Sequence, residues 1–258
     1  MKRYQLVELE DLSWFPNHLR DYITDFLRFV VEQMDFYAAI PALVLRGLGG
    51  SHSPHVVDLA SGGGGGWPSL IGRVREASPD ASVTLTDRYP NLQAFDRLAA
   101  RGIAGLAFCP ESISATEVPA SLKGMRTLFL SFHHFPPKLA QGILQDAVAG
   151  GEAILIVEIQ TRSFGDLMKH MLSPVAVLIA TPFIRPFRLG RLFYTYIVPV
   201  LPLVLWWDGV VSVLRSYRAK ELKAMVGRLE GGQGYAWEIA TDDSGRAPVH
   251  YLLGVPKG

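Results

Sequence analysis

The spacing of apolar positions predicts helices at the start of the chain. Between Leu19 and Leu48, apolar residues recur every three or four positions, which places them on one face of a helix. A run of Gly, Ser, His and Pro at 49–54 then breaks this pattern. We therefore expect a mostly helical segment over residues 1–50.

From residue 55 onward, short apolar runs alternate with helical periodicity. Strands that are apolar along their whole length and alternate with helices are typical of a parallel sheet covered on both faces. The expected strands lie at 55–60, 82–87, 103–109, 126–132 and 152–159, and helices are expected over 67–77, 92–101 and 137–148.

The end of the chain has a different pattern. Two runs with strand character, 235–241 and 247–255, are separated only by a turn that contains Asp243, Ser244 and Gly245. Because no helix fits between them, they are expected to form an antiparallel hairpin. The sequence thus predicts an α/β fold in one domain over 1–258: a mainly parallel seven-stranded sheet with an antiparallel C-terminal hairpin and helices on both faces.

The stretch 161–218 is unusually apolar. Its two longest apolar runs are interrupted by Pro182, Arg185, Pro199 and Pro202, whereas a membrane span needs about 20 apolar residues. Three interpretations stay open: an insert or lid that packs on the sheet and roofs a pocket, an element in peripheral contact with a membrane surface, and a true membrane span.

Polar and aromatic residues within this stretch have two possible roles. Asp208 is expected to have a structural role, either an ion pair, for which Arg215 or Arg218 could be the partner, or a cap, because a buried carboxylate needs a partner. The alternative is an acid in a substrate pocket. Four aromatic residues either belong to the core or line an apolar acceptor pocket: Tyr194, Tyr196, Trp206 and Trp207.

Charge and cysteine content exclude several classes of protein. The 258 residues include 25 Lys and Arg and 24 Asp and Glu, a formal net charge of +1, so we expect no nucleic-acid partner. The single cysteine, Cys109, cannot form a disulfide or a thiolate zinc cluster within the chain. Since the first residues also lack a signal-peptide pattern, we expect a cytoplasmic protein. The oligomeric state stays open.

The loop after the first predicted strand carries the strongest chemical signal, VVDLASGGGGGWP. Glycines allow a ligand to approach the backbone, and the next helix begins with free N–H groups. A phosphate-binding P-loop would need a Lys that is absent here. In the dinucleotide pattern GxGxxG, Trp67 or Pro68 would take the last glycine position. S-adenosylmethionine, which has no pyrophosphate, is the third candidate ligand.

Two acids flank this loop in the expected fold. Asp58 ends the first strand, and Asp87 ends the second strand about 20 residues beyond the glycines. An acid at the position of Asp87 can accept hydrogen bonds from the ribose hydroxyls of an adenosine ligand. Asp87 could instead cap a turn before Pro90, and Asp58 could hold loop amides.

With these motifs, the sequence resembles the class I, Rossmann-like S-adenosylmethionine-dependent methyltransferases over about 54–160 and the closing hairpin. Asp58, Gly62 and Gly64 match the first motif of that family, while Ala60 replaces its usual first glycine. The resemblance implies a loop that wraps the methionine moiety and an adenine contact after the third strand, from Glu111 or Ser114. The candidate cofactor contacts are Asp58, Ala60, Ser61, Gly62, Gly64, Asp87, Arg88, Glu111, Ser112 and Ser131.

His133 and His134, just past the fourth strand, are the candidate catalytic residues. A histidine could take a proton from the acceptor, or alignment of the two substrates could suffice without a base. A metal site that joins one histidine to Glu158 is disfavoured, because adjacent residues on an extended chain point to opposite faces. We therefore predict no metal.

These inferences predict methyl transfer from S-adenosylmethionine to a small, apolar or amphipathic acceptor. The alternative is a non-catalytic S-adenosylmethionine-binding module that acts through a partner or a membrane surface. A third class, an NAD-dependent oxidoreductase, is disfavoured by Trp67 and by the terminal hairpin.

Overall fold

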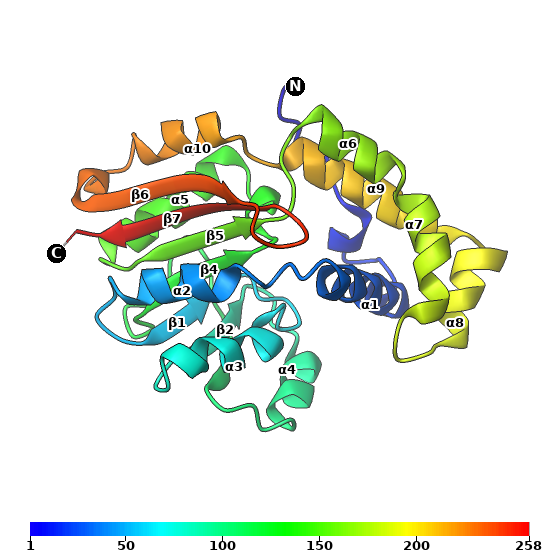
Figure 1. The fold of residues 1–258 in the computed structure, drawn as a ribbon, viewed down its shortest axis with the longest axis horizontal. Helices are drawn as coiled ribbons and strands as arrows, with labels where there is room; N and C mark the ends of the chain where they lie inside the picture. The colour runs from blue at the N-terminus through cyan, green and yellow to red at the C-terminus, as the bar shows by residue number, and fades with distance from the viewer. Residues whose placement is uncertain (258) are drawn as a thin grey trace. The chain divides into compact units, whose positions relative to one another are not determined.

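The computed structural model describes residues 1–257, which divide into two compact units (Figure 1). The helical unit comprises Met1–Phe36 and Gln160–Arg218, and the sheet unit comprises Tyr37–Ile159 and the chain from Ala219 onward. The segment expected over 1–50 is thus divided between the units, whereas the expected insert over 161–218 belongs entirely to the helical unit. Whether that insert roofs a pocket stays a prediction.

The sheet unit contains one seven-stranded sheet in the order β3-β2-β1-β4-β5-β7-β6. The first five strands pair in parallel, and β7 runs antiparallel to both β5 and β6. This arrangement confirms the predicted fold class, including the C-terminal hairpin. The strands are β1 (His55–Asp58), β2 (Ser82–Asp87), β3 (Leu106–Ser112), β4 (Met125–Phe129), β5 (Ile154–Glu158), β6 (Tyr235–Asp242) and β7 (Val249–Pro256).

Burial along the strands follows their place in the sheet. The central strands β1, β4 and β5 are buried almost throughout, while most positions of the edge strands β3 and β6 are half-buried or exposed. Continuous burial is expected where helices cover both faces of a parallel sheet. The uninterrupted apolar runs in the sequence therefore correspond to the centre of the sheet.

Five helices of the sheet unit lie against this sheet (Figure 1). Helices α2 and α3 contact each other, and α5 contacts α10, so the sheet is covered on both faces. Pro68 lies in the first turn of α3, where proline costs no hydrogen bond. The helices are α2 (Ile40–Leu48), α3 (Trp67–Ala77), α4 (Leu92–Ala99), α5 (Pro137–Ala149) and α10 (Ala219–Val226).

The third and fourth strands differ most from their predicted bounds. The third strand begins at Leu106 rather than at 103, because Gly102 and Gly105 adopt positive φ and keep the chain in a turn. The fourth strand ends at Phe129 rather than at 132. Leu130 adopts a φ of 54°, and a 3-10 turn, η2 (Phe132–His134), follows it.

The helical unit packs around its own apolar core. Its elements are η1 (Leu9–Asp11), α1 (Asn17–Gln33), α6 (Phe164–Met171), α7 (Ser173–Ala180), η3 (Thr181–Phe183), α8 (Leu189–Leu192), the π-helical turn η4 (Phe193–Ile197) and α9 (Val200–Arg215). Helices α1, α7 and α9 supply most of the core, which contains Phe15, Leu19, Ile23, Phe26, Val177, Ile184, Leu201, Val204 and Leu205.

Asp208 on α9 has partners other than those expected. Its carboxylate accepts hydrogen bonds from the backbone N–H of Leu9, at 2.6 Å, and of Glu10, at 3.2 Å. Arg215 forms ion pairs with Glu8 and Asp11 instead. Of the two structural roles expected for Asp208, the structure shows the cap: its carboxylate accepts from the first N–H groups of η1, in a segment far away in sequence. Burial raises the pKa of Asp208 to about 6.

The apolar stretch contains no single helix long enough and apolar enough to cross a membrane, within the described residues. One pair of helices, Leu189–Ile197 and Val200–Arg215, has the required length and composition only when taken together, and it bends by 79° at the break.

One carboxylate of the helical unit binds three arginines. Asp25 on α1 forms ion pairs with Arg28 at 2.9 Å, Arg191 at 2.8 Å and Arg188 at 3.3 Å. The Arg191 side chain is only 2% exposed. It also donates to the backbone carbonyl of Ile184, so Asp25 holds a buried cation that fixes the turn after α7.

We predict that Asp25→Ala lowers the free energy of unfolding by about 3–5 kcal/mol, because it leaves a buried guanidinium without its counter-charge. Urea denaturation measures the change. Asp21→Ala, at an exposed position on the same helix, is the matched control and should have little effect. Equal stabilities of the two variants would contradict the importance of the Asp25 cluster.

Candidate functional site: the carboxyl ends of the central strands

The candidate site lies where the strand order of the sheet reverses. Strand β1 has β2 on one side and β4 on the other, and all three run parallel. Open α/β sheets bind ligands at such a switch point, outside the carboxyl ends of the strands. The predicted residues from the ends of β1, β2 and β4 therefore share one edge of the sheet.

Asp58 is buried at the end of β1 and is fully engaged by its neighbours. Its Oδ2 accepts from the hydroxyl of Ser61, and its Oδ1 accepts from the hydroxyl of Thr127 on β4, both at 2.6 Å. The backbone carbonyl of Asp58 accepts a further bond from Thr86 on β2 at 2.8 Å. Asp58 thus ties together three strands and the start of the glycine loop.

Burial raises the pKa of Asp58 to about 6, against the opposing effect of the Ser61 and Thr127 hydroxyls. Both hydroxyls donate to the ionised carboxylate and so favour it. The desolvation of a completely buried charge is the larger effect. The residue is therefore poised to change protonation at mildly acidic pH.

Asp87 at the end of β2 holds the glycine loop directly. Its Oδ2 accepts from the backbone N–H of Gly62, and its Oδ1 accepts from that of Tyr89, both at 2.8 Å. Each carboxylate oxygen has capacity for a second hydrogen bond, so ribose hydroxyls could still be accepted. The structure thus brings Asp87 and the loop after Asp58 together, as the sequence predicted.

The backbone of the loop explains two of its glycines. Gly62 and Gly64 have φ of 54° and 105°, values that side chains disfavour. A Cβ at Gly64 would lie 2.4 Å from Leu98 of α4, so this position also needs glycine for close packing. Ala60 adopts a φ of 54° as well, where the resembling family usually has glycine.

The residues around the loop fit an adenosyl ligand. A Cβ at Gly62 would meet nothing within 4 Å, so the loop backbone there is open to a ligand. Across the switch point, just past β4, the hydroxyl of Ser131 is buried and has no hydrogen-bond partner within residues 1–257. A buried polar group without a partner is costly, and a ligand that donates or accepts there would satisfy it.

Two predicted cofactor contacts, Glu111 and Ser112, lie on β3 and have different neighbours. Ser112 pairs in register with Asp87 and donates its hydroxyl hydrogen bond to the carbonyl of Arg88 at 2.7 Å. Glu111 is exposed and accepts a hydrogen bond from the thiol of Cys109. Because β3 extends to Ser112, Glu111 lies within the strand and not in a loop after it. The structure therefore brings Ser112, but not Glu111, to Asp87.

His133 forms a dyad with Glu158. Its Nδ1 lies 3.0 Å and 3.1 Å from the two carboxylate oxygens of Glu158, at the end of β5, and its backbone N–H also donates to that carboxylate. Because a carboxylate only accepts, Nδ1 carries a proton, and in the neutral imidazole the lone pair is therefore on Nε2. The side chains are 6% and 13% exposed, so the pair is largely shielded from water.

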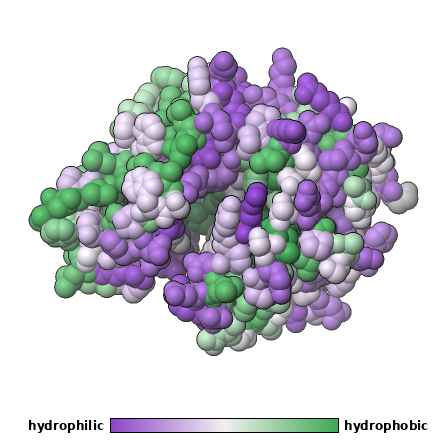
Figure 2. Space-filling model, turned by 180° about the vertical axis from the view of Figure 1, so that it is seen from behind, coloured by the Kyte–Doolittle hydropathy of each residue, from purple (hydrophilic) through white to green (hydrophobic). Residues whose placement is uncertain are grey.

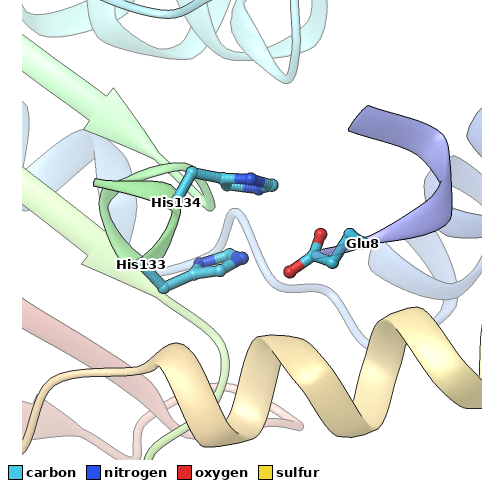
Figure 3. Close-up of side chains that lie close together, drawn as sticks. All are labelled: Glu8, His133 and His134. Carbon is cyan, nitrogen blue, oxygen red and sulfur yellow. The ribbon is translucent and has the colours of Figure 1, made fainter. Parts of the chain in front are cut away.

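His134 stands next to this dyad. The two imidazole centroids are 4.3 Å apart, and Figure 3 shows both rings extending the same way from the turn η2. The sequence analysis expected them on opposite faces, as on an extended chain. That expectation is wrong because η2 is a helical turn, which ends the alternation of a strand.

Sequence reasoning missed two parts of this site. It considered Glu158 only as a metal ligand, although a carboxylate at the end of a strand beside β4 can orient a histidine that follows β4. It also left out Thr127, whose position in the apolar run of the fourth strand was a usable signal, because a lone hydroxyl there needs a partner.

Comparisons with solved structures agree with this geometry. The chain is similar to the plantazolicin methyltransferase BpumL in complex with SAH, with a TM-score of 0.58 and 13% identity over 96% of this chain and 94% of that one. The fold is that of the class I, Rossmann-like methyltransferases. The predicted resemblance is therefore confirmed for the fold.

Two further similar structures belong to longer proteins. The pyocyanin biosynthetic protein PhzM gives a TM-score of 0.52 at 16% identity over 89% of this chain. The O-methyltransferase NcsB1 from neocarzinostatin biosynthesis, in complex with S-adenosylmethionine and 2-hydroxy-5-methyl naphthoic acid, gives 0.50 at 17% identity over 91%. The chain spans only 58% and 57% of their lengths. Comparisons with protein-family models and with curated proteins give no match.

The raised pKa of Asp58 predicts a specific dependence of stability on pH. A carboxyl group whose pKa is higher in the folded than in the unfolded state takes up a proton on folding, between about pH 4 and pH 6. Its contribution to stability is therefore complete below pH 4 and is lost as the pH rises through 6. Between pH 4.5 and 7.5 the free energy of unfolding should therefore fall by about 2 kcal/mol less in Asp58→Asn than in the unchanged protein. Urea denaturation across this range measures the difference.

The decrease should be reduced and not abolished in Asp58→Asn, because Asp208 also has a pKa of about 6. Asp96→Asn, on the exposed side of α4, is the matched control and should keep the pH profile of the unchanged protein. An Asp58→Asn protein with an unaltered profile would show that Asp58 does not titrate in this range.

Proposed function

We propose that this protein transfers a methyl group from S-adenosylmethionine to a hydroxyl group of a small, apolar or amphipathic molecule. The observation that carries the proposal is the pairing of two features at one edge of the sheet. One is the glycine loop held by Asp87, and the other is the His133–Glu158 dyad past the neighbouring strands.

The chain offers specific groups to each part of the cofactor. The loop Ser61–Gly64, whose backbone is open at Gly62, would hold the methionine moiety, and Asp87 would accept from the ribose hydroxyls. Ser131 supplies a buried hydroxyl that a ligand could satisfy. When bound, S-adenosylmethionine supplies a methyl group that its sulfonium has already activated, so binding, alignment and exclusion of water fall to the protein.

The dyad supplies the proton transfer. His133 would accept the proton of the acceptor hydroxyl at Nε2 as that oxygen takes the methyl group, with S-adenosylhomocysteine as the leaving group. Glu158 would keep the other proton on Nδ1 and stabilise the resulting imidazolium. His133 would then return its proton to solvent.

The similar structures support the two halves of this proposal. BpumL is described in complex with SAH, and NcsB1 is an O-methyltransferase in complex with S-adenosylmethionine and a hydroxylated naphthoic acid. Their fold matches that of this chain, and the residues at the switch point supply the chemistry that the reaction needs. The apolar or amphipathic nature of the acceptor is kept from the sequence-based prediction as part of this proposal.

Asp87→Asn should weaken binding of S-adenosylhomocysteine by about 10-fold to 100-fold, because a hydrogen bond to a charged group contributes about 1.5–3 kcal/mol. Isothermal titration calorimetry measures the affinity. Asp243→Asn, in the exposed turn of the hairpin, is the matched control and should bind as the unchanged protein does. Full affinity in Asp87→Asn would contradict the assignment of the ribose contact.

His133→Gln should reduce kcat for methylation of a phenolic acceptor by at least about 100-fold, the usual contribution of a general base, while binding of S-adenosylhomocysteine stays unchanged. Glu158→Gln should reduce kcat less and should move the pH at which the rate rises, because Glu158 acts through His133. His134→Gln is the control for the neighbouring ring and should have the smallest effect.

Two outcomes would contradict parts of this mechanism. Equal rates for His133→Gln and the unchanged protein would show that alignment alone suffices. Tight binding of the cofactor without transfer to any acceptor in a broad panel would favour a non-catalytic binding module instead.

A further inference from the structure

The helical unit exposes an unusual amount of apolar surface. Five large side chains between α6 and α9 are 65–74% exposed, namely Leu172, Ile179, Phe183, Leu189 and Ile197. More than half of the exposed large hydrophobic residues found within 1–257 lie between 164 and 207. Figure 2 shows hydrophobic side chains gathered at the left of the view, which is the end that carries α7 and α8.

These side chains belong to elements that pack on one another. Helix α7 contacts η3 and η4, and α8 contacts both of these turns as well. We call this surface, formed by residues 172–198, the apolar face. Monomeric soluble proteins rarely expose a continuous apolar patch of more than a few hundred Å², so a face of this kind marks an interaction site.

The charged residues between 167 and 207 are all basic. No Asp or Glu occurs between Asp166 and Asp208, whereas Lys169, Arg185, Arg188 and Arg191 lie in this interval. Asp25 alone faces three arginines, which are Arg28, Arg188 and Arg191. Arg191 is buried and Lys169 pairs with Asp166, so the exposed positive charge beside the apolar face comes from Arg185 and from the part of Arg188 that is exposed.

The loop from η3 to α8 combines both properties. Phe183, Phe187 and Leu189 are exposed, and Arg185 between them is exposed as well. Ile184 in the same loop is buried in the core, so it fixes the loop to the unit. Aromatic and aliphatic side chains with arginines beside them suit the boundary between lipid headgroups and acyl chains, where arginine keeps its charge among the headgroups.

We propose that the apolar face docks on the surface of a lipid bilayer that contains anionic lipids. The exposed side chains around Phe183 and Leu189 enter the headgroup boundary, and Arg185 and its neighbours contact the negative lipid headgroups. A second copy of this chain fits the face less well, because the basic residues beside the two copies of the face would repel each other. The proposal is independent of methyl transfer, since it uses no residue of the candidate site.

The test is flotation of the purified full chain with two kinds of vesicle, phosphatidylcholine alone and phosphatidylcholine mixed with phosphatidylglycerol. The protein should float with the mixed vesicles and much less with the neutral ones. Phe183→Ser/Leu189→Ser should reduce the partition coefficient at least about a hundredfold, because two large apolar side chains no longer enter the headgroup boundary. Arg185→Gln should reduce it about fivefold, the effect of one basic residue near the surface.

Matched controls lie on the sheet unit. Leu92→Ser/Leu139→Ser removes two exposed leucines from α4 and α5, and Lys220→Gln removes one exposed positive charge from α10. Both should float as the unchanged protein does. Circular dichroism checks that each variant is folded, and Phe183→Ser alone replaces the double variant should that one fail to fold.

Three results would overturn the proposal. The first is a protein that stays in solution with the mixed vesicles. The second is equal binding to neutral and anionic vesicles. The third is self-association, measured by light scattering, that Phe183→Ser/Leu189→Ser abolishes while vesicles have no effect, because the apolar face would then bind a second copy.

Discussion

The hydrogen bonds of one buried carboxylate hold the candidate site together. Asp58 accepts from Thr127 on the strand to one side and from Ser61 in the glycine loop, and its carbonyl accepts from Thr86 on the strand to the other side. The loop then reaches Asp87 through the N–H of Gly62. A charge in this position is costly to bury, so its partners must stay in place, and the loop takes one defined conformation.

The same edge of the sheet positions the proton-transfer dyad. Leu130 turns the chain out of β4, and the 3-10 turn that follows places the His133 ring against Glu158 of β5. Glu158 in turn fixes which nitrogen of His133 holds the proton. The proposed roles thus belong to different strands. The ends of β1 and β2 carry the cofactor contacts, and the ends of β4 and β5 carry the proposed base and its carboxylate partner.

The helical unit has a different physical character. Its buried charges are balanced locally, by Asp25 for Arg191 and by Asp208 for the N–H groups of η1. The apolar face is left exposed, with the exposed Arg185 among its apolar side chains. The membrane surface that we propose as the partner of this face would satisfy both properties at once, which solvent cannot do.

The sequence by itself determined the strands, the hairpin and the cofactor loop, because these depend on local patterns. Continuous apolar runs predict buried parallel strands, and a glycine tract between a strand and a helix needs no distant contact to be recognised. Only the tertiary structure decided the partners of Asp208 and the His133–Glu158 dyad, because those contacts join residues far apart in the chain. The left-handed backbone at Leu130, which ends β4 early and places both histidines on the same side, has no signature in the local sequence.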